Sequence, residues 1–366
     1  MYEYSHGGNV AFEGGREGTI DLSANMNPLG IPQGVQEAVI QEIPFSEYYP
    51  DSSSARLRAA IATYENVNED WIICGNGASD LIFRLPRAIQ AKKVLVTAPS
   101  FSDYERSARS SGARVAYHRL LEENGFALDD RLIDTVAWEK PDLVYLCSPN
   151  NPTGLVADPD LIQELLETCE DFNALVMVDE CFLDFTQKGQ ELTSKRFLGT
   201  YQNLIILKAF TKIFSLPGIR LGYALTANSS LIDQLYFHGP DWSVSNLAQA
   251  AGIAALKGAP DFIARSVAFV TTERALLAKV LSDLGYQVFD SQANYLFLQN
   301  PYPMNLKEAL DKKGIRIRSC GNYPGLDNSY YRIAIPKEVD KETVFAALEA
   351  VTQPYKATLT QEGSHQ

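Results

Sequence analysis

The stretch that most constrains the fold of this chain is residues 204–223, which reads LIILKAFTKIFSLPGIRLGY. Its first four residues form an apolar, β-branched run, which is typical of a buried strand in a parallel sheet. The run ends in polar sequence that holds Thr211 and Lys212, and Arg220 stands just before a second apolar run, LGYALT. The pattern therefore predicts a buried strand that places a lysine at its end, with an arginine close behind it.

Lys212 lies where a lysine side chain can become a nucleophile. Burial at the end of a strand disfavours the charged ammonium and lowers its pKa, which leaves an amine that can form an imine. Thr211 and Arg220 add a hydroxyl and a fixed cation, which suit a phosphate group. An imine-forming lysine beside a phosphate site is what pyridoxal 5′-phosphate (PLP) requires. The alternative is a lysine that extends past apolar neighbours to solvent.

Composition excludes several classes of protein. The 366 residues allow two domains or one large domain with an appendage, and 46% hydrophobic residues can form a large core. A net charge of −13 argues against nucleic acid or an anionic membrane as a partner. No apolar run reaches the roughly 18 residues of a membrane span, and no signal peptide is evident. The five scattered cysteines and four histidines show no metal-ligand spacing, so we expect reduced thiols, no metal and a cytoplasmic location.

Residues 1–34 are rich in glycine and carry little helical periodicity, which predicts an extended arm laid across other structure. His6 stands beside Gly7 and Gly8, and glycines allow the backbone to approach a ligand closely. Asn25 follows in a turn-rich stretch. These features make His6 and Asn25 candidate ligand contacts, although a terminal histidine without a role is the alternative for His6.

Residues 71–89 read as a strand, a glycine turn and a helix. The amides of Gly77, Ala78 and Ser79 would point outward from a helix N-terminus, where the helix dipole favours an anion. A plain turn is the alternative, but the phosphate predicted beside Lys212 favours the anion site. Phe101 follows the next strand, and its ring can stack on the cofactor pyridine or pack in the core.

Two further strands end on residues that can act on a bound cofactor. Asn151 follows the run LVYLC within SPNNPTG, and its amide can donate a hydrogen bond to a phenolate oxygen. Asp179 ends the run ALVMVD, at the edge where open α/β sheets bind ligands. A carboxylate there can keep a pyridine nitrogen protonated, so that the ring acts as an electron sink.

Two arginines stand out in the C-terminal third of the chain. Arg318 and Arg332 each lie in strand-like sequence, within a stretch that also carries glycine and proline turns. Surface arginines on strands are the alternative, but two of them beside such turns favour recognition of anions.

The order of these motifs resembles the class I/II aminotransferase-like, fold-type I PLP enzymes, over essentially the whole chain except its tail. The segment T-K-x-x-x-x-x-G-x-R-x-G around Lys212 is the most specific part of the resemblance. It implies an α/β fold, with a large domain built on a mostly parallel central sheet flanked by helices and a smaller C-terminal α/β domain. The expected segments are an N-terminal arm and first helix at 1–40 contributing to the small domain, a large PLP-binding domain at 41–250, a small domain at 251–355 and a flexible tail at 356–366.

Within this family the chain resembles two branches, the histidinol-phosphate aminotransferases and the threonine-phosphate decarboxylases. The stretches HGGN, DLSANMNPLG, PDWSVSN and IRSCGNYPGLDNSYYRIAI are more similar to the decarboxylases. The aminotransferases have a tyrosine three residues after the aspartate, whereas this chain has Phe182, as the decarboxylase pattern does. The decarboxylase branch implies conversion of L-threonine O-3-phosphate to (R)-1-amino-2-propanol O-phosphate and carbon dioxide, for the aminopropanol linker of cobalamin.

The resemblance also implies roles for individual residues. Lys212, Asp179 and Asn151 would carry the catalysis, Arg332 would hold the substrate carboxylate, and Arg318 would hold its phosphate together with His6 and Asn25. Tyr49 would reach the cofactor phosphate of a neighbouring subunit, which implies a homodimer with active sites at the interface. The predicted catalytic residues are Lys212, Asp179 and Asn151. The predicted cofactor-binding residues are Gly77, Ala78, Ser79, Phe101, Asn151, Asp179, Thr211, Lys212, Arg220 and Tyr49. The predicted substrate-binding residues are His6, Asn25, Asn151, Arg318 and Arg332.

Three alternative functions remain open at this point. An aminotransferase would use the same electron sink but would break the Cα–H bond, because the orientation of the substrate alone decides which bond breaks. A decarboxylase of serine phosphate, giving ethanolamine phosphate, would differ by one methyl group in the pocket. The third alternative is a PLP-binding regulatory protein without catalysis.

Overall fold

A computed structural model of the chain describes residues 7–8 and 18–362. Its centre is a seven-stranded sheet in the order β2-β8-β7-β6-β5-β3-β4. All neighbouring pairs are parallel except the two made by β8, which runs against both β2 and β7. The strands are β2 (Ile72–Gly75), β3 (Lys93–Ala98), β4 (Arg114–Arg119), β5 (Leu143–Cys147), β6 (Leu175–Asp179), β7 (Leu204–Ala209) and β8 (Gly222–Leu225).

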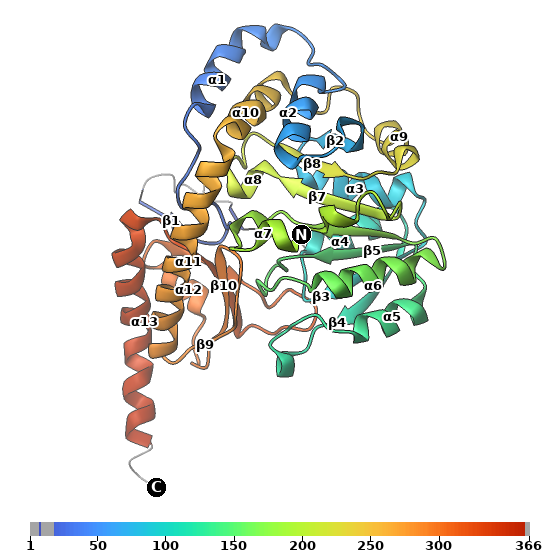
Figure 1. Cartoon of the computed structure of the whole chain (residues 1–366). Coiled ribbons are helices and arrows are strands. Elements are labelled where there is room, and N and C mark those ends of the chain that lie inside the picture. The colour runs from blue at the N-terminus through green and yellow to red at the C-terminus, as the bar shows by residue number, and fades with distance from the viewer. Residues whose placement is uncertain (1–6, 9–17, 363–366) are drawn as a thin grey trace.

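Helices cover both faces of this sheet (Figure 1). Side chains alternate along a strand, so Val176 and Val178 pack in one core with α2, α5, α6 and α10, while Met177 packs in a second core with α3, α4 and α9. This two-sided burial explains why the central strands are almost wholly apolar. The helices are α2 (Ala55–Glu65), α3 (Ala78–Ala88), α4 (Ser102–Ser110), α5 (Arg131–Glu139), α6 (Pro159–Glu170), α9 (Ser229–Phe237) and α10 (Asn246–Lys257).

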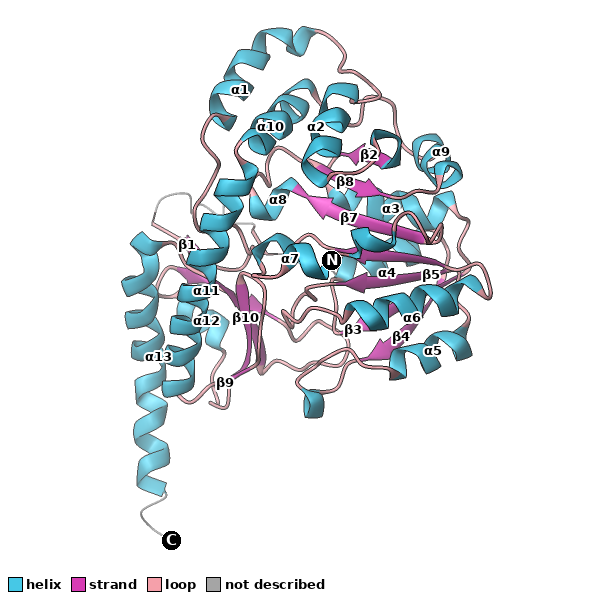
Figure 2. Cartoon of the chain, viewed as in Figure 1, coloured by secondary structure: helices cyan, strands magenta, loops and turns pink. Residues whose placement is uncertain are grey.

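The C-terminal part forms a second layered unit beside the first (Figure 2). Its antiparallel sheet has the order β12-β13-β10-β9, and a parallel pair joins β1 of the arm to β11. The strands are β1 (Ile20–Asp21), β9 (Gln287–Val288), β10 (Tyr295–Gln299), β11 (Ile315–Arg316), β12 (Arg318–Ser319) and β13 (Tyr330–Ala334). The helices are α11 (Ala259–Asp283), α12 (Leu306–Asp311) and α13 (Lys341–Glu362).

Short helices complete the chain and connect these elements. The helix α1 (Val35–Glu42) follows the arm and packs against α10. The remaining turns of helix are η2 (Ile43–Glu47), η3 (Glu69–Trp71), η4 (Glu122–Asn124), η5 (Leu183–Phe185), α7 (Gly189–Leu192), η6 (Ser194–Phe197), α8 (Phe210–Ile213) and η7 (Glu338–Asp340).

The predicted fold class is confirmed, because the central sheet is mostly parallel, is flanked by helices and is accompanied by a smaller α/β unit. One end of the chain differs from the prediction. The helix α13 continues to Glu362, although the sequence predicted a flexible tail from residue 356. The segment 355–362 contains no glycine or proline, so nothing in its sequence ends the helix before Gly363.

Candidate active site

A cavity of about 440 Å³ lies at the carboxyl ends of the central strands. Open α/β sheets bind their ligands at this edge, because the loops that follow the strands meet there. The cavity is lined by residues of the large sheet and its helices on one side, and by residues of the arm and of the C-terminal strands on the other. The residues predicted from the sequence that line it are Asn25, Ala78, Ser79, Phe101, Asn151, Asp179, Thr211, Lys212, Arg220, Arg318 and Arg332.

Lys212 lies in α8, directly after β7, and its ammonium donates a hydrogen bond of 2.7 Å to the Ala24 carbonyl of the arm. Burial, together with the nearby Arg332 guanidinium, lowers the pKa of Lys212 to about 7. Its Nζ also lies 5.8 Å from the centre of the Phe182 ring. A substantial fraction of this amine is therefore neutral near pH 7, as a nucleophilic lysine requires.

Asp179 ends β6 with both carboxylate oxygens held in place. The Tyr104 hydroxyl donates to Oδ2 at 2.6 Å, and the backbone amide of Cys181 donates to Oδ1 at 2.9 Å. Burial raises the pKa of Asp179, since an ionised carboxylate is poorly solvated there. A protonated ring nitrogen in the cavity would compensate that cost. The structure therefore fits a cofactor that presents such a group to Asp179.

The opposite wall has the features of an anion site. Gly77 begins α3 at φ +80°, and a Cβ there would lie 2.5 Å from Nη2 of Arg220. The guanidinium thus lies directly against the N-terminus of α3, beside Ala78 and Ser79. Only glycine permits this approach, and the resulting cluster of backbone amides and a cation suits a phosphate. Gly77 itself does not line the cavity but supports the residues that do.

Arg332 joins three segments that are distant in the sequence. It is 5% exposed in β13, and it donates to the side-chain oxygen of Asn151 and, at 2.5 Å, to the backbone carbonyl of Ser23. Its Nε has no hydrogen-bond partner among the described residues. Because Asn151 accepts from Arg332 through its oxygen, its amide nitrogen is left as a donor, and Asn151 lines the cavity.

Arg318 lies opposite Arg332 in the register of β12 and β13. Its guanidinium donates to Oδ1 of Asn322 at 3.1 Å and lies over the Tyr323 ring, 5.6 Å from its centre. Two arginines opposite each other on neighbouring strands repel, and an anion between them removes that repulsion. The pair therefore favours an anionic ligand at this end of the cavity.

Asn25 adds a second polar group to this end. It is 1% exposed, its backbone is in the left-handed region at φ +53°, and among the described residues neither amide atom of its side chain has a partner. A buried amide without partners costs free energy, so a ligand that bonds to it would be favoured. Gly7 and Gly8 line the same cavity, and a Cβ on Gly7 would lie 2.4 Å from the Ser23 carbonyl.

Besides Gly77, one predicted residue does not line this cavity. Tyr49 is 79% exposed after η2, where its ring stacks on Trp242 with the ring centres 4.5 Å apart. The predicted residue His6 lies outside the described residues. Conversely, the sequence analysis missed Tyr104 and Tyr323, which line the cavity. Tyr104 follows Phe101 by three residues in the first turn of α4, but no local pattern shows that its hydroxyl reaches Asp179.

Comparisons with known proteins identify the family. The family model described as "Aminotransferase class I and II" matches residues 17–351, so the chain belongs to this PLP-dependent family, as the sequence predicted. A threonine-phosphate decarboxylase of Salmonella typhimurium is 32% identical over 360 residues, which cover 96% of this chain and 97% of that protein.

Proteins of the histidinol-phosphate aminotransferase branch are also similar to this chain. A histidinol-phosphate aminotransferase of Methanococcus aeolicus is 30% identical over 324 residues, which cover 86% of this chain and 85% of that protein. The crystal structure of a histidinol-phosphate aminotransferase from Clostridium acetobutylicum superposes with a TM-score of 0.85 at 30% identity, covering 92% of this chain and 99% of that one.

The geometry of the cavity fits PLP. Lys212 would hold the aldehyde carbon, Asp179 the ring nitrogen, and the N-terminus of α3 with Arg220 the phosphate. When bound there, PLP supplies an electron sink for the bonds around the substrate Cα.

Within residues 7–8 and 18–362, no group of three or more histidine, cysteine or acidic side chains could hold a metal ion. None of the described helices has the length and apolarity needed to cross a membrane.

Proposed function

We propose that this enzyme decarboxylates L-threonine O-3-phosphate to (R)-1-amino-2-propanol O-phosphate and carbon dioxide, for the aminopropanol linker of cobalamin. The observation that carries the proposal is the pair Arg318 and Arg332, which face each other across two strands at the substrate end of the cavity. The anion site at α3 and Arg220 is taken by the cofactor phosphate. Two further cations therefore suit a substrate with two anionic groups of its own, a carboxylate and a phosphate.

The residues divide the work between holding the substrate and moving a proton. Arg332 holds the carboxylate, while Arg318 and Asn25 hold the phosphate. With both ends fixed, the Cα–carboxylate bond can be set perpendicular to the plane of the cofactor, which is the orientation that favours its cleavage. Lys212, whose pKa lies at about 7, can then deliver a proton to Cα.

A direct experiment separates this proposal from its relatives. The purified holoenzyme is incubated with threonine phosphate in the absence of any 2-oxo acid, and carbon dioxide release is measured. We expect stoichiometric carbon dioxide and aminopropanol phosphate, with none from the Lys212→Ala variant. No carbon dioxide, together with transfer of the amino group to an added 2-oxo acid, would overturn the decarboxylase assignment in favour of an aminotransferase.

Histidinol-phosphate aminotransferase is the second candidate, and the similarity to proteins of that name over most of the chain favours it. Incubation with histidinol phosphate and 2-oxoglutarate tests it directly. Serine phosphate is a competing substrate for the decarboxylase, since a single methyl group is worth only roughly 1–3 kcal/mol in a pocket. The ratio of kcat/KM for the two phosphorylated amino acids decides between them.

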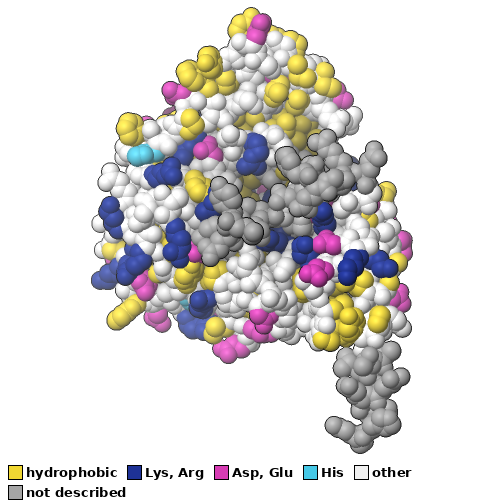
Figure 3. All heavy atoms as spheres, turned by 180° about the vertical axis from the view of Figure 1, so that it is seen from behind, with side chains coloured by type: hydrophobic (Ala, Val, Ile, Leu, Met, Phe, Trp, Pro, Cys, Tyr) yellow, Lys and Arg dark blue, Asp and Glu magenta, His cyan; other side chains and the backbone are white. Residues whose placement is uncertain are grey.

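The proposal includes a homodimer, which an exposed apolar surface supports. Apolar side chains gather at the top of the molecule, around α1 and η2 (Figure 3). A surface of this kind on a protein of net charge −13 favours a partner, and a second copy of the chain would bring Tyr49 to the neighbouring active site. The exposed members are Ile40, Ile43, Phe45, Tyr48, Tyr49 and Trp242.

Complementation tests this arrangement. If Tyr49 serves the partner's cofactor, mixing the weakly active Tyr49→Phe variant with the inactive Lys212→Ala variant should restore activity, because one site of each mixed dimer is then intact. No gain on mixing would show that Tyr49 does not serve the active site of the partner subunit. The five cysteines are all free, which supports the proposed location in the reducing cytoplasm.

A further inference from the structure

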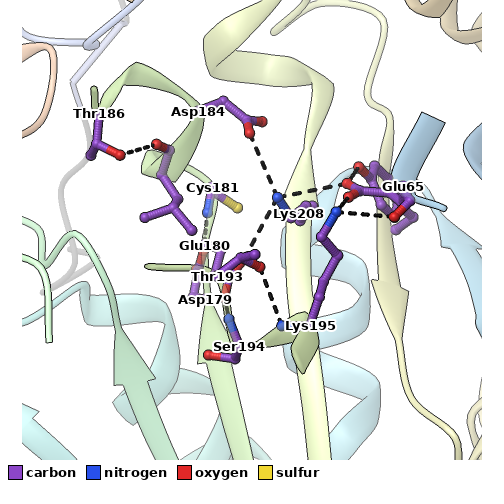
Figure 4. A network of polar contacts seen from close by, with 12 residues as sticks. Glu65, Asp179, Glu180, Cys181, Asp184, Thr186, Thr193, Ser194, Lys195 and Lys208 are labelled. Carbon is purple, nitrogen blue, oxygen red and sulfur yellow. Dashed lines mark hydrogen bonds and ion pairs between the residues drawn. The ribbon is translucent and has the colours of Figure 1, made fainter. Parts of the chain in front are cut away.

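A buried ionic cluster, drawn in Figure 4, lies at the ends of β6 and β7 and uses side chains that alternate with those lining the cavity. Its centre is Lys208 of β7, which is 3% exposed. The Lys208 ammonium lies 3.6 Å from one carboxylate oxygen of each of Glu65, Glu180 and Asp184. These acids come from the end of α2, from the residue after β6 and from η5, so one lysine joins three elements.

The carboxylates of the cluster are also held by neighbouring groups. Glu65 accepts hydrogen bonds from Lys195 at 2.6 Å and from the Tyr223 hydroxyl at 2.5 Å. Glu180 accepts from the Thr193 hydroxyl at 2.7 Å and from the Ser194 amide at 2.6 Å. Both glutamates therefore have every carboxylate oxygen bonded, which fixes their orientation.

The charges within the cluster depend on Lys208. Burial raises the pKa of Glu180 and of Asp184, and Lys208 opposes that effect at both. Burial would also raise the pKa of Glu65, but Lys208 and Lys195 outweigh it and hold that pKa below its usual value. Without the Lys208 cation, three buried carboxylates would face one another with only Lys195 beside them, which is strongly unfavourable.

The cluster is directly connected to the cofactor site through the backbone. Side chains alternate along a strand, so Asp179 faces the cavity while Glu180, the next residue, faces Lys208. The peptide between them is bound to both neighbouring strands, because the Glu180 amide donates to the Leu207 carbonyl and the Ser148 amide donates to the Asp179 carbonyl, each at 2.9 Å. One peptide group at the end of β6 therefore carries both the side chain that faces the cavity and the side chain that Lys208 holds, so the cluster and the sheet together fix the position of Asp179.

We infer that Lys208 and Glu180 are positioning residues for the cofactor, which hold the end of β6 so that Asp179 meets the ring nitrogen of PLP. Neither side chain lines the cavity, so each acts through Asp179 rather than by contact with the ligand. The same lysine precedes Lys212 by four residues along β7 and α8, so it also holds the segment that carries the nucleophile. The inference depends on membership of the PLP family and not on which substrate is decarboxylated.

The test compares Lys208→Met and Lys208→Arg with the matched control Lys279→Met. Lys279 forms an exposed pair with Asp283 at 2.5 Å, so its loss removes a lysine ion pair that is not part of the buried cluster. Three quantities are measured for each variant: the Tm of the apoprotein, the Kd for PLP and the pH midpoint of the visible absorbance of the bound cofactor.

We expect Lys208→Met to raise the Kd for PLP at least tenfold and to move the absorbance midpoint upward. The upward direction follows because a ring nitrogen that loses Asp179 is less often protonated, so the ring withdraws fewer electrons and the imine keeps its proton to higher pH. Lys208→Arg should recover part of both changes, and Lys279→Met should match the wild type.

A purely structural role gives a different result. In that case Lys208→Met would lower the apoprotein Tm and leave the Kd for PLP and the absorbance midpoint at their wild-type values, which would overturn the inference. Should Lys208→Met not fold, Glu180→Gln supplies the same comparison, because it keeps the side-chain shape and removes the charge that faces Lys208. An unchanged Kd and midpoint in a folded Glu180→Gln protein would equally overturn it.

Discussion

The two ends of the active-site cavity are built in different ways. The cofactor end consists of residues at the ends of adjacent strands and at the start of one helix, so Lys212, Asp179 and the anion site at α3 are all placed by elements of the large sheet, although the arm also bonds to Lys212. The substrate end is assembled from the arm, from the loop that holds Asn151 and from the strands of Arg318 and Arg332. The positions of the residues at the cofactor end thus depend mainly on one sheet. The positions of those at the substrate end depend on contacts between segments that are remote in the chain.

This difference suggests how specificity can change within one family. Residues fixed by a shared sheet can keep the same cofactor chemistry, while residues on separate segments can change what is held above it. Arg332 holds the segments of the substrate end together, because it donates to Asn151 on one side and to the Ser23 carbonyl of the arm on the other. Substitutions at the cofactor end should therefore abolish the chemistry, whereas substitutions at the substrate end should select among substrates.

The largest effect is expected at the cofactor end. The Lys212→Ala variant should lose both turnover and the yellow absorbance of the lysine–cofactor imine, because among the described residues no other lysine lines the cavity. Visible spectra and carbon dioxide assays of the purified variant measure this, with the exposed Lys279→Ala as a control that should be unaffected. An alanine variant that keeps the imine spectrum would show that another residue binds the cofactor.

The next largest effect is expected at the substrate end, where Arg318→Gln removes a cation proposed to hold the substrate phosphate. Loss of a charge-assisted hydrogen bond costs on the order of 1.5–3 kcal/mol, which corresponds to roughly a tenfold to hundredfold fall in kcat/KM. The fall should be large for threonine phosphate and small for unphosphorylated threonine, because only the first offers the phosphate. It should extend to kcat if the phosphate contact also orients the Cα–carboxylate bond.

The comparison of substrates contains its own control. Arg332→Gln should impair both amino acids, since each carries the carboxylate that Arg332 is proposed to hold. Equal losses on both substrates for Arg318→Gln would instead make Arg318 structural or a second carboxylate ligand. The division of the cavity into a cofactor end and a phosphate-selective end would then have to be redrawn.

The same division decides how much could be predicted from sequence. At the cofactor end, each functional residue follows an apolar run or a glycine turn, so Asp179 and Lys212 could be placed from local pattern alone. Tyr104 could not, because its bond to Asp179 depends on how α4 packs over the sheet. At the substrate end, the register that sets Arg318 opposite Arg332 and the Ser23 carbonyl that binds Arg332 are tertiary features without a local signal.

A third prediction tests whether the two ends are electrostatically coupled. Because the pKa of Lys212 is about 7, the rate at which the apoprotein captures PLP should rise roughly tenfold between pH 6 and pH 8 and then level off. Arg332 is one of the causes of that low pKa, so Arg332→Gln should move the midpoint upward. Stopped-flow absorbance at a series of pH values measures both. A midpoint that Arg332→Gln leaves in place would mean that Arg332 does not contribute to the low pKa of Lys212.

The smallest expected effect concerns Phe182, which lines the cavity and packs edge-on against Tyr295 at 5.1 Å. In the Phe182→Tyr variant, the added hydroxyl should donate to the cofactor phenolate oxygen beside Asn151. A hydrogen bond to the phenolate stabilises the deprotonated imine, so the pH midpoint of the visible absorbance should fall, by about one pH unit or less.

The matched control for Phe182→Tyr is Phe101→Tyr, which adds the same hydroxyl to another ring of the cavity wall. Phe101 is predicted to stack on the face of the cofactor, so its hydroxyl should not reach the phenolate and the midpoint should stay at the wild-type value. A midpoint that is unchanged or raised in Phe182→Tyr would show that this side chain is remote from the phenolate oxygen. A fall confined to Phe182→Tyr would place the residue that distinguishes the two branches of the family at the cofactor end, so that the cofactor end also differs between relatives.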